Sequence, residues 1–187
     1  MNISFLLAAI IFPVSELLLL ATKRAKKGSA VIKDKGSMKL GWLLVVASIL
    51  VAIWGTRIVF AHIPVSLIPY NILSIVFLAI GFIVRWSAII TLGNMFTTNV
   101  AVQNNHQLVN RGLYKFIRHP SYLGLMLEFT GLGFYFGNWI SLFALLVPLI
   151  MGMIVRIKLE ENVLVEALGQ SYIDYASETK RLIPGVW

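Results

Sequence analysis

The chain has 187 residues, of which 58% are hydrophobic and only 13% are charged, and its formal net charge is +8. A soluble domain carries about 25% charged residues, so this composition excludes a soluble globular protein and a disordered one and indicates an integral membrane protein. Cysteine is absent, which excludes disulfides, thiolate metal sites and cysteine nucleophiles.

Five apolar segments approach or reach the length of about 20 residues that a membrane-crossing helix needs. In chain order they are residues 2–21, 40–61, 70–91, 120–136 and 139–155. The last two are short and are separated only by the turn dipeptide Gly137-Asn138, which predicts a helical hairpin. The sequence therefore predicts an all-α integral membrane protein with about five transmembrane helices, the last two forming a helical hairpin.

The basic residues gather in alternate loops. Seven lie between the first two predicted spans, from Lys23 to Lys39, whereas residues 62–69 contain none. The third loop and the segment after the last span hold Arg111, Lys115, Arg118, Lys158, Lys180 and Arg181. Because loops rich in Lys and Arg stay on the cytoplasmic side, we expect the N-terminus outside and the C-terminus in the cytoplasm. The positive charge is thus a topology signal, and nucleic acid is not expected as a partner.

Polarity changes along the chain, although no internal repeat or low-complexity segment divides it. We expect a single membrane-embedded domain over residues 1–187. Residues 1–91 hold three plain spans, whereas residues 92–187 include polar, tyrosine-containing stretches on the predicted cytoplasmic side. Chemistry on a water-soluble cofactor would have to take place there, so this half is the predicted cofactor-binding and catalytic region.

The densest cluster of reactive side chains lies in residues 100–124, VAVQNNHQLVNRGLYKFIRHPSYLG. Pro120 suits the first turn of a helix, where its missing N–H costs nothing. His119 would then sit at the helix entrance, beside free backbone N–H groups that favour anionic ligand groups. The alternative is an interfacial loop whose tyrosine and arginine side chains reach the lipid headgroups.

Arg156 and Glu160 are spaced i,i+4 where the last predicted span ends, which puts both on one helix face within reach of a salt bridge. They could form an ordinary surface pair, worth less than about 1 kcal/mol. They could also belong to a ligand site, because a guanidinium group binds carboxylates bidentately and Glu160 could face a cationic group.

Four further ionisable residues lie inside predicted spans, where charge is costly: Glu16, Arg57, Arg85 and Glu128. Glu16 and Arg85 both fall toward the cytoplasmic ends of their helices, so they could pair. Glu128 lies in mid-span and must face protein or a cavity. The three histidines lack the helical spacing of metal ligands, so no metal is expected.

Several motifs together resemble the isoprenylcysteine carboxyl methyltransferase family. They are HQLVNRGLY at residues 106–114, RHPSYLG at 118–124, RIKLEE at 156–161 and GQSYIDY at 169–175. Their order along the chain is that of the family, and the joint pattern is more specific than any one motif. The resemblance covers residues 90–184, about half of the chain, whereas the first three spans match only in being hydrophobic.

That family methylates the C-terminal carboxylate of prenylated cysteines. The resemblance implies S-adenosyl-L-methionine as cofactor, S-adenosyl-L-homocysteine as product, and a lipid-modified cysteine or other lipid-like acceptor, met among membrane lipids, as partner. It implies that Arg156 orients the substrate carboxylate. The positions that it implies for cofactor binding are Gln103, His106, Gln107, Leu108, Val109, Tyr114, His119, Pro120, Ser121, Tyr122 and Glu160.

The chemistry of the methyl acceptor distinguishes carboxyl methylation from its nearest alternative, the methylation of a phospholipid amine. A carboxylate has a reference pKa of about 3.5 and is ionised at neutral pH, so it needs no general base before attack. A phospholipid N-methyltransferase, which resembles the same pattern, must deprotonate an ammonium group first. His119, Glu128 or Tyr122 would be the candidate bases.

Two further classes are alternatives. Membrane sterol reductases have a similar C-terminal region that binds NADPH, whose extra phosphate calls for a basic cluster such as Arg111, Lys115 and Arg118. A channel or transporter predicts inverted repeats or polar faces along the spans. The sequence shows neither of these two features.

Overall fold

The computed structural model describes residues 3–23, 30–32, 37–64, 69–98, 101–103 and 107–183 of the chain. Five long helices account for most of them: α1 (Ile3–Thr22), α2 (Ser37–Gly55), α3 (Tyr70–Leu92), α4 (Pro120–Phe136) and α5 (Trp139–Leu168). A shorter helix, α6 (Gln170–Glu178), follows α5. The other elements of the described residues are the 3-10 turns η1 (Val59–Ala61), η2 (Gly93–Met95) and η3 (Gly112–Lys115), and the strands β1 (Ala30–Ile32) and β2 (Ala101–Gln103).

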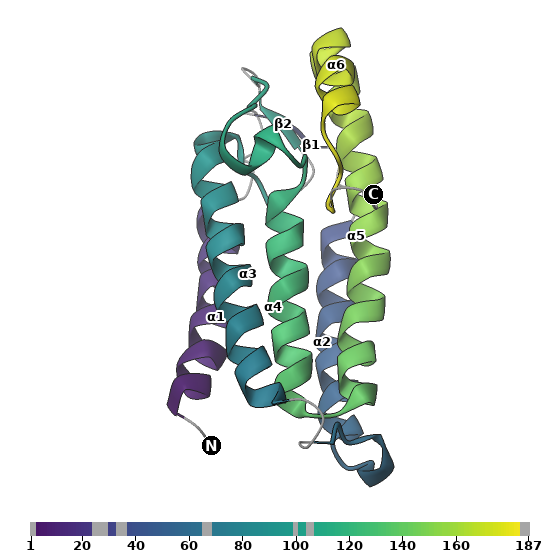
Figure 1. Cartoon of the computed structure of the whole chain (residues 1–187). Coiled ribbons are helices and arrows are strands. Elements are labelled where there is room, and N and C mark those ends of the chain that lie inside the picture. Colours follow the sequence, from purple (N-terminus) through teal and green to yellow (C-terminus); the bar gives the residue numbers. More distant parts are fainter. Residues whose placement is uncertain are drawn as a thin grey trace.

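The long helices run side by side, with α4 in the middle of the bundle (Figure 1). α4 packs against α3 on one side and against α5 on the other, while α1 contacts α3 and α2 contacts α5. The two strands, α6 and the segment that leads into α4 gather at one end of the bundle, the upper end in Figure 1. The chain segments that the sequence marks as polar therefore meet at one end of the bundle.

Helices are observed at all five positions where the sequence predicts spans, but two of them end elsewhere. The helix predicted over residues 40–61 ends at Gly55, where the backbone N–H groups of Arg57 and Ile58 donate to the oxygens three residues before them instead of four. Beyond this turn, the carbonyl of Ile58 accepts from the side chain of Asn138 at 3.1 Å. α5 continues past Val155 to Leu168. The end of an apolar run marks a change of polarity only, and between Val155 and Gly169 the sequence has no glycine or proline to end the helix.

A small strand pair adds to the helical architecture. β1 and β2 pair antiparallel, with Val31 opposite Val102. β1 follows α1 and β2 follows α3, so the pair joins the loop after the first helix to the loop after the third. The three-residue length of each strand is too short to give a periodic signal in the sequence.

α3 and α4 approach each other closely because glycines stand where they cross. A Cβ atom on Gly124 would lie 2.6 Å from the backbone nitrogen of Arg85, and a Cβ atom on Gly81 would lie 2.7 Å from that of Glu128. Small residues let membrane helices pack backbone against backbone. This contact, which we call the α3–α4 seam, holds two of the ionisable residues of the spans inside the protein.

Gly137 and Asn138 fix the turn between α4 and α5. Gly137 ends α4 with a φ of 58°, a left-handed conformation that glycine adopts without a steric penalty. Asn138 is fully buried, and its side-chain oxygen accepts from the backbone N–H groups of Ile140 at 2.9 Å and Ser141 at 3.3 Å. It thereby satisfies N–H groups that the first turn of a helix leaves unpaired.

Apolar side chains cover the outside of the bundle. Within the part of the chain that the structure describes, two helices, Tyr70–Met95 and Trp139–Leu168, are long and apolar enough to cross a membrane, and the apolar stretches Ile10–Thr22 and Gly41–Gly55 are shorter. Leu43, Ile90 and Met151, on three different helices, are 66%, 72% and 64% exposed. Apolar surface on this scale fits contact with lipid rather than with water.

Gly124→Ala is expected to destabilise the bundle, because the added methyl group would meet the backbone of Arg85. Overpacking of this kind costs about 1–3 kcal/mol. Gly152→Ala on α5 is the matched control, since nothing lies within 4 Å of a Cβ atom there. In detergent, the Gly124 variant should lose its monodisperse peak at a lower temperature than wild type, and the Gly152 variant should not. Equal melting of the two variants would contradict the close α3–α4 seam.

Candidate functional site

A cavity of about 440 Å³ runs between the helices and has walls of two kinds. The polar wall includes Gln107, Tyr114, His119, Ser121, Tyr122, Arg156, Glu160, Tyr172 and Tyr175. The apolar wall includes Phe12, Leu17, Trp42, Val45, Ile49, Leu125, Phe129, Leu145 and Leu149. The polar residues come from the second half of α5, the start of α4, α6 and the segment before α4, and the apolar residues come from α1, α2, α4 and the first half of α5. The cavity therefore leads from the polar end of the bundle into its apolar interior.

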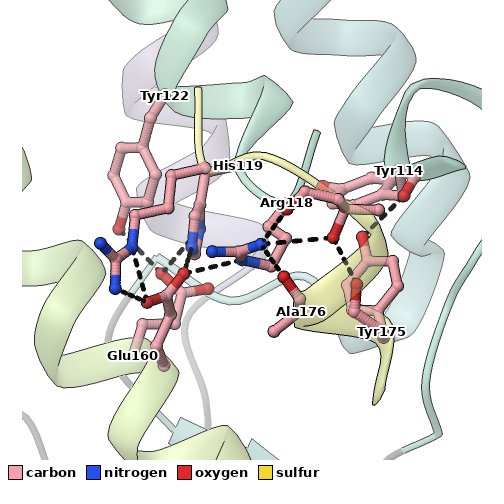
Figure 2. Close-up of polar contacts among 10 residues, drawn as sticks. Tyr114, Arg118, His119, Tyr122, Glu160, Tyr175 and Ala176 are labelled. Carbon is pink, nitrogen blue, oxygen red and sulfur yellow. Dashed lines mark hydrogen bonds and ion pairs between the residues drawn. The ribbon is translucent and has the colours of Figure 1, made fainter. Parts of the chain in front are cut away.

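Tyr122 connects Arg156 to Glu160 on the polar wall. Its hydroxyl donates to Oε2 of Glu160 at 3.1 Å and accepts from Nε of Arg156 at 3.3 Å. Figure 2 shows the side chains of Tyr122 and Glu160 pointing toward one another. Nη2 of Arg156 donates to the backbone oxygen of Thr98 at 2.8 Å. The i,i+4 pair of the sequence thus lies at the cavity, and a tyrosine hydroxyl from α4 lies between its two members.

Glu161, the next residue after Glu160, is buried and contacts three side chains, those of Arg118, His119 and Arg181. Its Oε1 accepts from Nε of Arg118 at 2.9 Å, and its Oε2 accepts from Nε of Arg181 at 2.9 Å. Nε2 of His119 lies 3.3 Å from Oε1 of Glu161, and Nδ1 lies 4.0 Å from Oε2 of Glu160. His119 is the N-cap residue of α4, as expected, but its side chain makes no capping bond. The ring of His119 faces the carboxylates of Glu160 and Glu161. Their negative charge disfavours an anionic ligand group at this position, although the place of His119 at the start of a helix had suggested one.

The segment after α6 is bound to the segment before α4. The backbone N–H of Arg118 donates to the oxygen of Lys180 at 2.7 Å, and that of His119 donates to the oxygen of Arg181 at 3.0 Å. The guanidinium group of Arg118 also donates to the oxygen of Ala176 at 2.8 Å (Figure 2). These bonds hold α6 against the start of α4 and close this side of the cavity.

Buried tyrosines from η3 and α6 complete the polar wall. The hydroxyl of Tyr175 donates to the backbone oxygen of Tyr114 at 2.7 Å. Burial raises the pKa of Tyr175 to about 12. Burial, followed by the negative charge of Glu160, also raises the pKa of Tyr114. Both hydroxyls therefore keep their protons at neutral pH, and that of Tyr175 is a neutral donor.

The expected pairing of Glu16 with Arg85 is confirmed. Nε and Nη2 of Arg85 donate to the two carboxylate oxygens of Glu16 at 2.7 and 2.8 Å, and Nη1 donates to the backbone oxygen of Ser121 at 3.1 Å. Glu16 and Arg85 both line the cavity. Glu128 faces protein, as expected: it is 2% exposed, and its Oε2 lies 3.9 Å from Nε of Arg85.

The structure brings most of the predicted site residues to this cavity. Those that line it are Gln107, Leu108, Val109, Tyr114, His119, Ser121, Tyr122, Arg156 and Glu160. Pro120 is fully buried at the first position of α4 and is not part of the cavity wall. Gln103 lies in β2, and its side chain falls outside what the structure describes, as does all of His106.

Residues that sequence reasoning did not assign to the site also line the cavity. Tyr172 and Tyr175 are spaced i,i+3, which places them on one helix face and could have indicated a shared role. Thr98 carries no such signal, because only the fold brings its carbonyl to Arg156. Arg118, considered above for a phosphate cluster, is instead bound to Glu161 and Ala176.

Comparisons with known proteins point to one family. A family model described as the isoprenylcysteine carboxyl methyltransferase (ICMT) family matches residues 72–166. Protein-S-isoprenylcysteine O-methyltransferase B of Arabidopsis thaliana is 35% identical over 109 residues, which cover 57% of this chain and 55% of that protein. The protein-S-isoprenylcysteine O-methyltransferase of Schizosaccharomyces pombe is 34% identical over 117 residues, which cover 62% of this chain and 50% of that protein.

A solved structure shares the fold. It is that of the eukaryotic intramembrane Ras methyltransferase ICMT, with a TM-score of 0.66 and 26% sequence identity over 96% of this chain and 64% of that one. The chain thus spans about half the length of the relatives that it matches in sequence. The likeness to an intramembrane protein, together with the apolar helices, supports an integral membrane protein.

Glu161→Gln is expected to loosen the segment after α6, because it removes the negative charge that Arg118 and Arg181 share. Removing one partner of a buried ion pair costs about 3–5 kcal/mol, and we expect the lower end because the Arg181 side chain is 34% exposed. Trypsin should cleave after Lys180 or Arg181 faster than in wild type. Glu178→Gln, at an exposed position on α6, is the control and should change stability by less than about 0.5 kcal/mol. Equal cleavage of wild type and the Glu161 variant would contradict this role.

Proposed function

The chain belongs to the isoprenylcysteine carboxyl methyltransferase family, and we propose on this premise that it transfers a methyl group from S-adenosyl-L-methionine to the carboxylate of a lipid-like acceptor. A C-terminal S-prenylcysteine is the proposed acceptor, and the product is its methyl ester. The relatives named as protein-S-isoprenylcysteine O-methyltransferases support this acceptor.

The observation that carries the proposal is that one cavity joins a polar wall to an apolar one. Arg156 and Glu160 lie on the polar wall, and Trp42, Ile49 and Phe129 lie on the apolar wall. An S-prenylated cysteine has the same division, with a carboxylate at one end and a long apolar chain at the other. A polar cofactor and an apolar acceptor can therefore meet in this cavity without either leaving its preferred surroundings.

The residues of the polar wall fit S-adenosyl-L-methionine, which has both charged and apolar parts. Glu160 offers a carboxylate to a cationic or hydroxyl-bearing part, and Leu108 and Val109 offer apolar contact to the adenine ring. Two wall hydroxyls, those of Tyr172 and Thr98, are buried without a hydrogen-bond partner among the described residues. When bound, the cofactor supplies an electrophilic methyl group on its sulfonium sulfur.

Arg156 is placed to orient the carboxylate of the acceptor. Its bonds to the hydroxyl of Tyr122 and to the carbonyl of Thr98 hold the guanidinium group at the cavity wall. The acceptor carboxylate is ionised at neutral pH, so the protein need not supply a base. What these residues contribute is alignment of the acceptor oxygen, an effect of proximity and orientation.

We propose the following arrangement in the membrane. The five long helices span the bilayer as one domain, with the last two as a hairpin, the N-terminus outside, and the C-terminus and cofactor site in the cytoplasm. The basic residues of alternate loops support this orientation. The gathering of α6, the strands and the segment before α4 at one end of the bundle supports a single polar face (Figure 1).

Methyl transfer from methyl-labelled S-adenosyl-L-methionine to N-acetyl-S-farnesylcysteine tests the proposed function. The purified protein in liposomes is expected to produce base-labile label, because a methyl ester is hydrolysed by base. Phosphatidylethanolamine, offered in parallel, tests for amine methylation. Label on phosphatidylethanolamine alone, or on neither acceptor, would contradict carboxyl methylation of a prenylcysteine.

Glu160→Ala and Arg156→Ala are expected to fail in different ways. Loss of a hydrogen bond to a charged group costs about 1.5–3 kcal/mol, or about 10- to 100-fold in affinity. Glu160→Ala should therefore raise the Kd for S-adenosylhomocysteine by that factor, measured by calorimetry. Arg156→Ala should leave this Kd nearly unchanged and should lower kcat/KM for the prenylcysteine by a similar factor.

Glu166→Ala, at an exposed position farther along α5, is the control for both variants and should alter neither quantity. If S-adenosylhomocysteine binds the Glu160 variant as tightly as wild type, the role of Glu160 is wrong. If the Arg156 variant loses cofactor affinity instead of acceptor turnover, the role of Arg156 is wrong.

A further inference from the structure

Tyr172 stands out among the polar groups of the cavity wall. It lies in the first turn of α6 and is 3% exposed. Its hydroxyl is shielded from solvent and has no hydrogen-bond partner among the described residues. A buried hydroxyl without a partner is costly, because folding removes its bonds to water and replaces them with nothing.

Neighbouring tyrosine hydroxyls on the same wall are satisfied by the protein itself. The hydroxyl of Tyr122 donates to Glu160, and that of Tyr175 donates to the carbonyl of Tyr114. Tyr172 and Tyr175 are close, with ring centroids 6.0 Å apart, yet among the residues that the structure describes only the hydroxyl of Tyr175 has an acceptor. Helix α6 therefore carries one tyrosine whose hydroxyl is bound by the protein, Tyr175, and, one helical turn before it, one whose hydroxyl is left for a ligand, Tyr172.

The charges around Tyr172 restrict what that ligand atom can be. Burial, followed by the negative charges of Glu161 and Glu160, raises the pKa of the Tyr172 hydroxyl. The group therefore remains a neutral donor at neutral pH. Arg118 and Arg181 offset the charge of Glu161, so the carboxylate of Glu160 is the group that disfavours a further carboxylate here, and the acceptor of this hydrogen bond is uncharged.

We propose that the hydroxyl of Tyr172 donates a hydrogen bond to an uncharged oxygen or nitrogen atom of the adenosine part of the cofactor. This makes Tyr172 a further cofactor-binding residue, and the inference rests on the proposed function. The ribose hydroxyls and the adenine ring nitrogens are uncharged acceptors, whereas the amino-acid part of the cofactor ends in a carboxylate. The second partnerless hydroxyl, that of Thr98, lies on the residue whose carbonyl holds Arg156 and so belongs to the acceptor side of the cavity.

Tyr172→Phe tests this inference, because it removes the hydroxyl and keeps the ring. Binding of S-adenosylhomocysteine and of 5′-methylthioadenosine, which lacks the amino-acid part, is measured by calorimetry on the whole 187-residue chain. Loss of a neutral hydrogen bond should weaken both ligands about 3- to 10-fold and by the same factor. The melting temperature without ligand should stay unchanged or rise, because a phenyl ring needs no partner.

Tyr175→Phe is the matched comparison on the same helix. It leaves the buried carbonyl of Tyr114 without its donor, so it should lower the melting temperature without ligand. A purely structural role for Tyr172 predicts the same loss of stability in both variants and would overturn the inference.

The remaining outcomes separate the inference from the proposed function. Equal affinity of wild type and the Tyr172 variant for both ligands would overturn the inference and leave the proposed function standing. Weaker binding of S-adenosylhomocysteine alone would move the contact to the amino-acid part and overturn the assignment to adenosine. Failure of the wild type to bind S-adenosylhomocysteine would overturn both.

Discussion

The carboxylate of Glu161 is the interaction on which the polar end of the molecule depends. It gathers Arg118 and His119, which precede α4, and Arg181, which follows α6, around one buried group on α5. Without it, the guanidinium groups of Arg118 and Arg181, from two parts of the chain, would face each other in a partly buried space. Because Glu160 is its chain neighbour, the same helical turn that anchors the fold also presents a carboxylate to the cavity. Two adjacent residues thus have different partners: Glu161 binds arginines of the protein, and Glu160 lines the cavity.

The helix packing explains why the cavity lies where it does. Along the α3–α4 seam, glycines bring the two backbones together and leave no room between them. α1 and α2 contribute larger side chains, such as Phe12 and Trp42, to the apolar wall, on either side of the central helix in Figure 1. The ion pair of Glu16 with Arg85 also lines the cavity, which satisfies two charges that lipid could not. The close packing of α3 against α4 leaves no cavity between these two helices, and the cavity lies instead where α1, α2 and α5 face α4.

Much of this fold could be predicted from the sequence, because apolar runs and turn residues carry strong local signals. The bounds of α4 follow from Pro120 and Gly137, which respectively suit the start and the end of a helix. The end of α5 could not be found from hydropathy, since the helix continues where the apolar run stops. The strand pair could not be found either, because three residues give no period.

The site shows the same division between local and non-local information. Tyr122, Arg156 and Glu160 belong to motifs, and the structure brings them to one cavity. The role of Thr98 depends on a contact with a helix 58 residues away in the chain, and no local pattern encodes it. The clustering of Arg118 and Arg181 on Glu161 likewise depends on the folded chain.

The central claim is that one cavity receives both the cofactor and the apolar chain of the acceptor, and photolabelling tests it most directly. A farnesylcysteine carrying a diazirine near the end of its isoprenoid chain would be irradiated with the protein in the presence of S-adenosylhomocysteine, and the labelled residues mapped by mass spectrometry. The account predicts label on the apolar wall, at residues such as Trp42, Ile49 and Leu149, and its loss when unlabelled farnesylcysteine competes. Label confined to the outer surface, at residues such as Leu43, Ile90 and Met151, and unaffected by the competitor, would contradict it.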